Sequence, residues 1–143
     1  MRYQDYLKKN QSCPFCHLEK GEIFKQNRFA WLILAKAPYT RDHLLVVPRR
    51  HAIKLSKLSR EEKDGFEKLI YYGMKLLHKK YPNVSIIYRE GRKDQVGKSI
   101  NHMHYHLIPN LRIGAVDINL NHRKIMDEDE YVKKTRAFKN RFL

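Results

Sequence analysis

The chain has 143 residues, of which 42% are hydrophobic, and this is enough to bury one core but not two. We therefore expect a single domain over residues 1–143. A formal net charge of +15 favours phosphate-bearing partners, although charge alone does not separate a nucleotide from a nucleic acid. Because the charges are scattered along the chain, a Lys-rich residue usage in the host explains them equally well.

Two classes of protein are disfavoured by the sequence, namely membrane proteins and secreted disulfide-rich proteins. No apolar run approaches the roughly 20 residues needed to cross a bilayer, and the first residues lack a signal peptide's apolar stretch. We therefore expect a cytoplasmic protein with no membrane partner. The two cysteines, Cys13 and Cys16, are too close in sequence to staple a fold. Their spacing suits a metal site in a reducing compartment.

The first half of the chain is predicted to form a short helix followed by strands. A polar helix over residues 3–9 precedes strands over residues 22–25 and 29–34, which meet at a turn around Asn27. The run at residues 43–48 is apolar and rich in β-branched side chains, and it ends in a proline. This pattern predicts a buried strand.

The longest helix is predicted to begin at Ser59, where Ser59 and Glu62 form a capping box, and to end before Pro82. A strand over residues 84–88 follows, and a polar, glycine-containing loop over residues 90–98 comes after it.

Two elements remain towards the C-terminus. A strand is predicted over residues 103–108, and a last helix runs from Asp127 to about residue 140, with Asp127 and Glu130 as its capping pair. The fold class is therefore α+β. We expect a mostly antiparallel sheet with one long central helix and a C-terminal helix.

Three histidines, His102, His104 and His106, occupy alternate positions of the strand predicted near residue 103. With a period of two they point to one face, and the residues between them can pack on the core. Such a row suits either a metal site or a covalent catalyst with one ring as the nucleophile. Nearby, Gly97 lets the backbone approach a ligand, and the Ser99 hydroxyl can donate to a phosphoryl oxygen, which favours the catalyst.

These segments together resemble the histidine triad (HIT) family. Its signature, His-φ-His-φ-His-φ-φ with φ hydrophobic, is matched in full by residues 102–108. The resemblance extends to residues 13–23, 43–51 and 97–100, in the family's order. It implies the HIT-like fold, commonly assembled as a homodimer through the long helix and a strand.

The resemblance implies a role for each histidine near the phosphate. His104 would attack the α-phosphorus and form a nucleotidyl-histidine that water then resolves. His106 would hydrogen-bond a non-bridging oxygen and stabilise charge in the transition state, together with Ser99 and the backbone near Gly97. His43 matches a fourth family histidine close to the triad.

The resemblance also implies a structural zinc ion. Bacterial members often hold zinc with a Cys-x-x-Cys pair near the N-terminus, the histidine after the Pro-basic-basic step and the first triad histidine. Here these are Cys13, Cys16, His51 and His102. A Cys2His2 set is typical of a closed structural site. The alternative is two free cysteines and a His51 with a purely structural role.

Some positions depart from the family pattern. Ala35 stands where many relatives have an Asn or Asp that binds the ribose, which leaves nucleoside specificity open. Arg89 and Lys98 replace a frequent Asn and a frequent Gln. Both add positive charge to the predicted phosphate-binding set, which also includes Gly97 and Ser99, and this charge suits a longer polyphosphate or a more highly charged substrate.

The expected function is hydrolysis or nucleotidyl transfer at the α-phosphorus of a small nucleotide, with an adenosine-type substrate favoured. Dinucleoside polyphosphates and nucleoside phosphoramidates both stay open. Two alternatives remain. One is a nucleotide-binding or scaffold protein with incidental catalysis, and the other is aprataxin-like removal of AMP from a 5′-adenylated nucleic acid, for which the basic charge argues.

Overall fold

The computed structural model describes residues 13–91, 100–112 and 125–142. It forms two compact units, one ending at Leu111 and the other beginning at Arg112, and each is described by itself. The helix predicted over residues 3–9 lies outside the described residues. The single domain over residues 1–143 stays a prediction.

The first unit is built on a five-stranded sheet in which every neighbouring pair is antiparallel. In spatial order the strands are β1 (Ile23–Gln26), β2 (Ala30–Leu34), β3 (Leu44–Pro48), β5 (Tyr105–Pro109) and β4 (Val84–Tyr88). Two short 3-10 helices, η1 (Lys20–Glu22) and η2 (Leu55–Lys57), join this frame. The α+β fold and the antiparallel sheet are confirmed, and the first four strands agree with the sequence prediction within one residue at each end.

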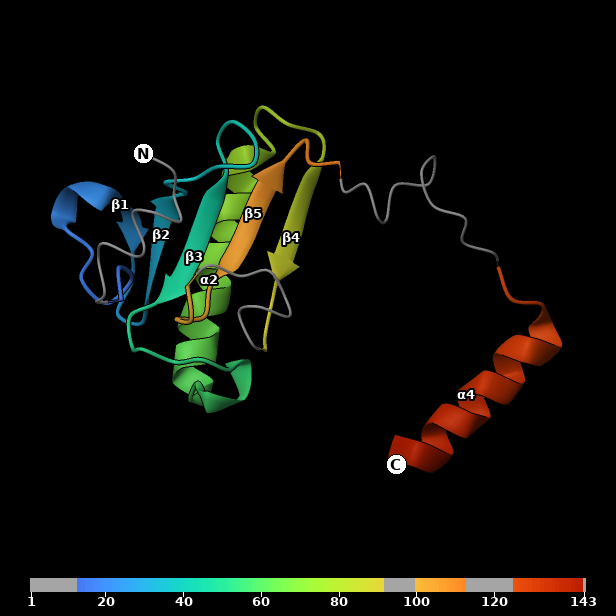
Figure 1. Cartoon of the computed structure of the whole chain (residues 1–143). Coiled ribbons are helices and arrows are strands. Elements are labelled where there is room, and N and C mark those ends of the chain that lie inside the picture. The colour runs from blue at the N-terminus through green and yellow to red at the C-terminus, as the bar shows by residue number, and fades with distance from the viewer. Residues whose placement is uncertain (1–12, 92–99, 113–124, 143) are drawn as a thin grey trace. The chain divides into compact units, whose positions relative to one another are not determined.

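The long helix α2 (Arg60–Leu77) lies across one face of the sheet (Figure 1). Its capping box is formed as predicted, because the Ser59 hydroxyl accepts from the Glu62 N–H at 3.1 Å and the Glu62 carboxylate accepts from the Ser59 N–H at 3.0 Å. The helix approaches the sheet closely at Gly73, where a Cβ atom would lie only 2.5 Å from Cδ1 of Leu107. A glycine is therefore required by space at this crossing.

The turn between β1 and β2 is organised by one side chain. The Asn27 Oδ1 atom accepts hydrogen bonds from the N–H groups of Phe29 and Ala30, both at 3.0 Å. Its amide nitrogen donates to the Gly65 carbonyl of α2 at 2.7 Å. The predicted turn is thus confirmed, and the same residue ties the hairpin to the helix.

Side-chain alternation along the strands produces two apolar layers. Leu32 and Val46 belong to the larger cluster, which packs against α2, whereas Ile33 and Val47 belong to a smaller cluster that includes Phe15. Because neighbouring strand residues point to opposite faces, β3 is buried along its whole length. Phe15 of the smaller cluster contacts the rings of His102 and His104, so these histidines lie next to an apolar side chain.

The second unit contains α4 (Glu128–Phe142). Its first turn is capped by Asp127, whose Oδ1 atom accepts from the Glu130 N–H at 2.8 Å. The predicted C-terminal helix and its capping pair are therefore confirmed. Among the described residues of both units, no helix is long and apolar enough to cross a membrane.

Candidate active site and metal centre

The triad histidines lie where β5 begins, and here the predicted strand boundary was wrong. The strand begins at Tyr105, so His102 and His104 belong to the segment that leads into it. The reason is a change of backbone partner, since the Met103 N–H donates to the carbonyl of Ala52, beyond the end of β3, at 2.8 Å. All three imidazoles are nevertheless buried and lie in sequence along this side of the sheet.

His102 faces a group of potential metal ligands. Its Nε2 lies 2.7 Å from the carbonyl oxygen of Pro48, and because a carbonyl only accepts, Nε2 carries the hydrogen. Burial lowers the pKa of His102 to about 4, so the ring is neutral and Nδ1 carries a lone pair. The Nδ1 atom lies 3.5 Å from the sulfur of Cys13 and 3.5 Å from the sulfur of Cys16.

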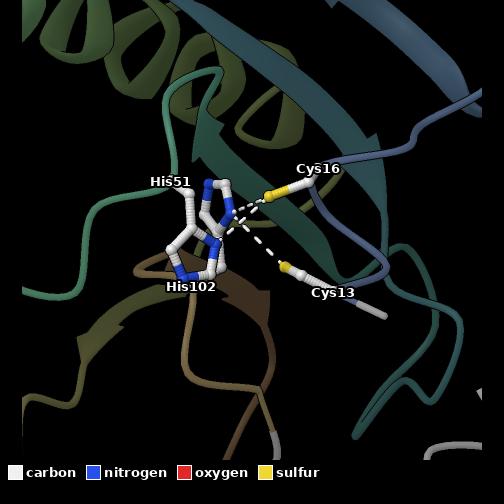
Figure 2. Close-up of side chains that lie close together, drawn as sticks. All are labelled: Cys13, Cys16, His51 and His102. Carbon is white, nitrogen blue, oxygen red and sulfur yellow. Dashed lines mark hydrogen bonds between the residues drawn. The ribbon is translucent and has the colours of Figure 1, made fainter. Parts of the chain in front are cut away.

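His51 completes this group, and Figure 2 shows the four side chains converging from three separate segments. Its Nδ1 lies 3.1 Å from the Cys16 sulfur, and all four ligand atoms lie within 4.8 Å of one another. A tetrahedral zinc ion with bonds of about 2.1 Å to nitrogen and about 2.3 Å to sulfur holds its ligand atoms about 3.4 to 3.8 Å apart. The residues predicted as ligands are therefore brought together, and they could hold a metal ion.

The surroundings of the Cys16 thiol disfavour its ionisation. The pKa of Cys16 is raised to about 11, first by burial and then by the neighbouring Cys13 thiol. A bound metal ion reverses this preference, because thiolate is the form that coordinates. The donor set thus fits a divalent ion of borderline softness such as zinc.

On the other side of the triad, His43 and His106 are hydrogen-bonded at 2.9 Å between Nε2 and Nδ1. The backbone N–H of Tyr39 donates to His43 Nδ1 at 3.2 Å, so this nitrogen is an acceptor and the hydrogen of the neutral ring sits on Nε2. His43 therefore donates to His106. Because Nδ1 of His106 accepts this bond, the single ring N–H of the neutral His106 is on Nε2.

Both rings of this pair are held in the neutral form. Burial is the largest cause in each case, and it lowers the pKa of His43 to about 4 and that of His106 to about 3. The neighbouring His104 adds to both shifts, and Arg89 adds to that of His106. A neutral His106 can present an N–H to an anion without releasing a proton.

His104 lies between the two arrangements. Its Nδ1 is 2.8 Å from the carbonyl oxygen of His102, so Nδ1 donates and the neutral ring carries its lone pair on Nε2. The His104 and His106 ring centroids are 4.9 Å apart, and the edge of Phe15 packs on His104 at 5.1 Å. This arrangement could combine a nucleophilic nitrogen with an adjacent N–H donor.

Of the other predicted substrate-binding residues, the structure describes only Arg89. Gly97, Lys98 and Ser99 lie outside the described residues. Arg89 is described, and its guanidinium carbon lies 5.9 Å from the centroid of the Tyr39 ring. Tyr39 in turn stacks on His43 with ring centroids 5.6 Å apart.

Sequence reasoning missed Tyr39 and Phe15. Phe15 lies between the two cysteines of the Cys-x-x-Cys pair, so its closeness to a predicted ligand pair was the available signal. Tyr39 precedes His43 by four residues in a loop, and nothing in its spacing indicates that its backbone would orient the ring of His43.

The chain was compared with models of known protein families. The family model of the HIT domain matches residues 19–112, and the chain belongs to this family. Adenosine 5′-monophosphoramidase of Schizosaccharomyces pombe is 29% identical over 102 residues, which are 68% of this chain and 74% of the relative. Bis(5′-adenosyl)-triphosphatase of Saccharomyces cerevisiae is 24% identical over 102 residues, 66% of this chain and 47% of the relative.

Solved structures with the same fold include two of this family. A histidine triad nucleotide-binding protein from Candida albicans has a TM-score of 0.67 at 20% identity, covering 91% of this chain and 96% of its own. A zinc-bound histidine triad family protein from Mycobacterium smegmatis has a TM-score of 0.56 at 24% identity, covering 89% and 92%. These similarities establish the fold.

Proposed function

We propose that the chain is a nucleotide hydrolase or nucleotidyl transferase that acts at the α-phosphorus of an adenosine-type nucleotide through a covalent bond to His104. The observation that carries the proposal is the orientation of two neighbouring rings. The Nδ1 hydrogen of His104 is engaged by the His102 carbonyl, which leaves the lone pair on Nε2, and the hydrogen of His106 is directed to its Nε2 by His43.

The reaction proceeds in two displacements. The Nε2 lone pair of His104 forms a bond to the α-phosphorus, the bond from phosphorus to the leaving group breaks, and its electron pair departs with the leaving group. Water then attacks the same phosphorus, the P–N bond breaks with its electron pair returning to His104, and the water proton passes to solvent. His106 donates its N–H to a non-bridging oxygen in both steps, which stabilises the charge that develops there.

The printed names of relatives support this chemistry. The names adenosine 5′-monophosphoramidase and bis(5′-adenosyl)-triphosphatase each specify an adenosine nucleotide as the substrate. One names a phosphoramide and the other a triphosphate. Their names therefore support an adenosine-type substrate and leave the leaving group open.

We also propose that Cys13, Cys16, His51 and His102 hold one structural zinc ion. The convergence of four ligand atoms within 4.8 Å of one another supports this, as does the zinc-bound title of the Mycobacterium smegmatis protein. All four positions would be filled by protein ligands, so the ion would fasten the segment around residue 13 to the segment that leads into β5 and would supply no open coordination position.

A homodimer and a cytoplasmic location stay predictions from sequence. For the dimer, the exposed apolar side chains of Tyr71 on α2 and Ile86 on the edge strand β4 are the supporting observation, with exposed fractions of 64% and 48%. Light scattering coupled to size exclusion measures the oligomeric state directly.

Intact-protein mass spectrometry tests the covalent step. The unaltered protein and His104→Ala are each mixed with adenosine 5′-phosphoramidate, diadenosine triphosphate and a 5′-adenylated oligonucleotide, and AMP release is followed by chromatography. We expect an adenylyl adduct and AMP only with the unaltered protein. Nucleotide binding without turnover in both proteins would support the binding or scaffold alternative, and turnover of the oligonucleotide alone would support the aprataxin-like one.

A further inference from the structure

A tyrosine and an arginine extend the pair formed by His43 and His106. The Tyr39 ring stacks on His43 at a centroid distance of 5.6 Å and an interplanar angle of 20°, and it lies 6.3 Å from the His106 ring. The guanidinium of Arg89 lies over Tyr39 at 5.9 Å. A planar cation is thus held beside the histidines by an aromatic ring.

Strand register places Arg89 on the same side of the sheet as the histidines. Tyr88 pairs with Tyr105, and both rings stack on the side that faces α2. Arg89 directly follows Tyr88, and His104 directly precedes Tyr105, so the antiparallel register carries these two residues to the same end of the strand pair. If the alternation continues one residue beyond the strands, both side chains point to the other face. The electrostatic effect of Arg89 on His106 agrees with this placement.

Within the described residues, Arg89 forms no ion pair with a carboxylate, whereas Arg50 does. The Arg50 guanidinium donates to the Glu62 carboxylate from Nε, at 3.0 and 3.3 Å, and from Nη2, at 3.0 Å. Among the described residues, Arg89 lies over the Tyr39 ring and acts electrostatically on the imidazole of His106. The guanidinium of Arg89 is half-buried and lies next to an aromatic ring and an imidazole. A cation in this position favours the binding of an anion.

We propose that Arg89, oriented by Tyr39, forms the subsite for the leaving group and selects leaving groups that carry phosphate. The preferred substrates are then dinucleoside polyphosphates, and phosphoramidates with an uncharged amine are disfavoured. This proposal rests on the proposed function, because it assigns one side of the same reaction centre.

The electron balance of the first displacement explains the selectivity. When the bond from the α-phosphorus to a bridging oxygen breaks, its electron pair goes to that oxygen, and the departing nucleoside phosphate gains a negative charge that Arg89 can stabilise. When a P–N bond breaks, the amine must instead take up a proton. A fixed cation next to that amine gives no comparable stabilisation.

The test compares two substrates in matched variants. We expect Arg89→Gln to lower kcat/KM for diadenosine triphosphate by about 10- to 100-fold, as for the loss of one charge-assisted hydrogen bond, and to change kcat/KM for adenosine 5′-phosphoramidate by less than about threefold. Arg89→Lys retains part of the preference, because the charge stays but the planar fork is lost. Tyr39→Leu shifts the substrate ratio in the same direction as Arg89→Gln.

Arg28→Gln is the control, because Arg28 also lies over an aromatic ring, that of Phe29 at 5.3 Å, but at the hairpin turn away from the histidines. It removes one charge and one cation–π contact and should leave the substrate ratio unchanged. An equal fall for both substrates in Arg89→Gln, or no fall for either, overturns the inference. Thermal unfolding of each variant establishes that it folds.

A second measurement keeps the inference distinct from the proposed function. If the unaltered protein turns over neither substrate, the proposed function fails, but binding still tests Arg89. We then expect Arg89→Gln to weaken the affinity for a non-hydrolysable diadenosine triphosphate analogue by about tenfold and to leave AMP affinity unchanged. Equal affinities of the variant and the unaltered protein for the analogue contradict the leaving-group subsite.

Discussion

His43 donates a hydrogen bond from Nε2 to Nδ1 of His106 at 2.9 Å, and this bond determines which nitrogen of His106 carries a hydrogen. The direction of the bond is set one step earlier, by the backbone N–H of Tyr39 at His43 Nδ1. The tautomer of His106, which would touch the phosphate, therefore depends on the backbone of Tyr39, which would not.

Removing His43 should lower catalysis and leave the metal site intact. We expect His43→Ala to lower kcat by about 10- to 100-fold, because His106 then populates both tautomers and presents its N–H less often. Zinc content, measured by atomic emission, should stay at the level of the unaltered protein, since His43 is not among the four clustered ligands. An unchanged kcat would show that the bond to His106 has no role in turnover.

Stability should fall as the pH drops below 6.5. The unfolded histidines titrate near pH 6.5, whereas the pKa values of His43 and His106 in the fold are about 4 and about 3. Between these values the unfolded chain binds protons that the folded chain does not, so the free energy of unfolding decreases with falling pH. At about 1.4 kcal/mol per pKa unit, the loss can reach about 3.5 kcal/mol for His43 and about 5 kcal/mol for His106.

Urea unfolding at several pH values measures this dependence, and His43→Gln should reduce its slope between pH 6.5 and 4. His78→Gln is the matched control, because His78 is exposed at the end of α2, where its ring Nδ1 is hydrogen-bonded to the Tyr81 carbonyl. Identical slopes in all three proteins would rule out the buried pair as the source.

Loss of one thiol should abolish metal binding and destabilise the first unit. We expect Cys16→Ser to lower the zinc stoichiometry from about one to near zero. The free energy of unfolding should fall by about 4 kcal/mol if zinc is present at about a thousand times its Kd. His17→Ala is the control, since this exposed histidine follows Cys16 directly but is not among the clustered ligands.

His104→Ala separates two uses of the histidine row. It should retain zinc, because only His102 of the triad lies in the ligand cluster. Loss of zinc in His104→Ala would instead favour a metal carrier that uses all three histidines.

A small substitution at the crossing of α2 and the sheet should be costly. Gly73→Ala places a methyl group 2.5 Å from Cδ1 of the fully buried Leu107, and the required shift should cost about 1 to 3 kcal/mol. The better helix propensity of alanine offsets about 1 kcal/mol of this. Chemical unfolding should therefore show a net loss, whereas Gly21→Ala, with no atom within 4 Å of its Cβ position, should show none from crowding.

The strands and both α-helices were predictable from residue type and capping. Residues 84–88 are mostly β-branched or aromatic, which favours a strand, and Ser59 with Glu62 marks a helix start without any tertiary information. The start of β5 was not predictable. It depends on Met103 finding the Ala52 carbonyl as its partner, which is a contact between segments far apart in the chain.

The same distinction holds for the candidate site. The four potential metal ligands were recognisable through residue type and the family resemblance. The ring orientations of His102 and His104 were not, because they are fixed by two backbone carbonyls, those of Pro48 and His102 itself, whose directions only the fold determines. Stacking of Arg89 on Tyr39 likewise joins two loops that are separate in sequence.

His102 contributes to both centres through different atoms of one residue. Its ring nitrogen Nδ1 faces the thiols, and its carbonyl oxygen accepts the hydrogen bond from His104. A metal ion that orders this residue would also order the acceptor for the nucleophile. By thermodynamic reciprocity, if bound metal raises nucleotide affinity by some factor, bound nucleotide raises metal affinity by the same factor, so each ligand reports on the occupancy of the other.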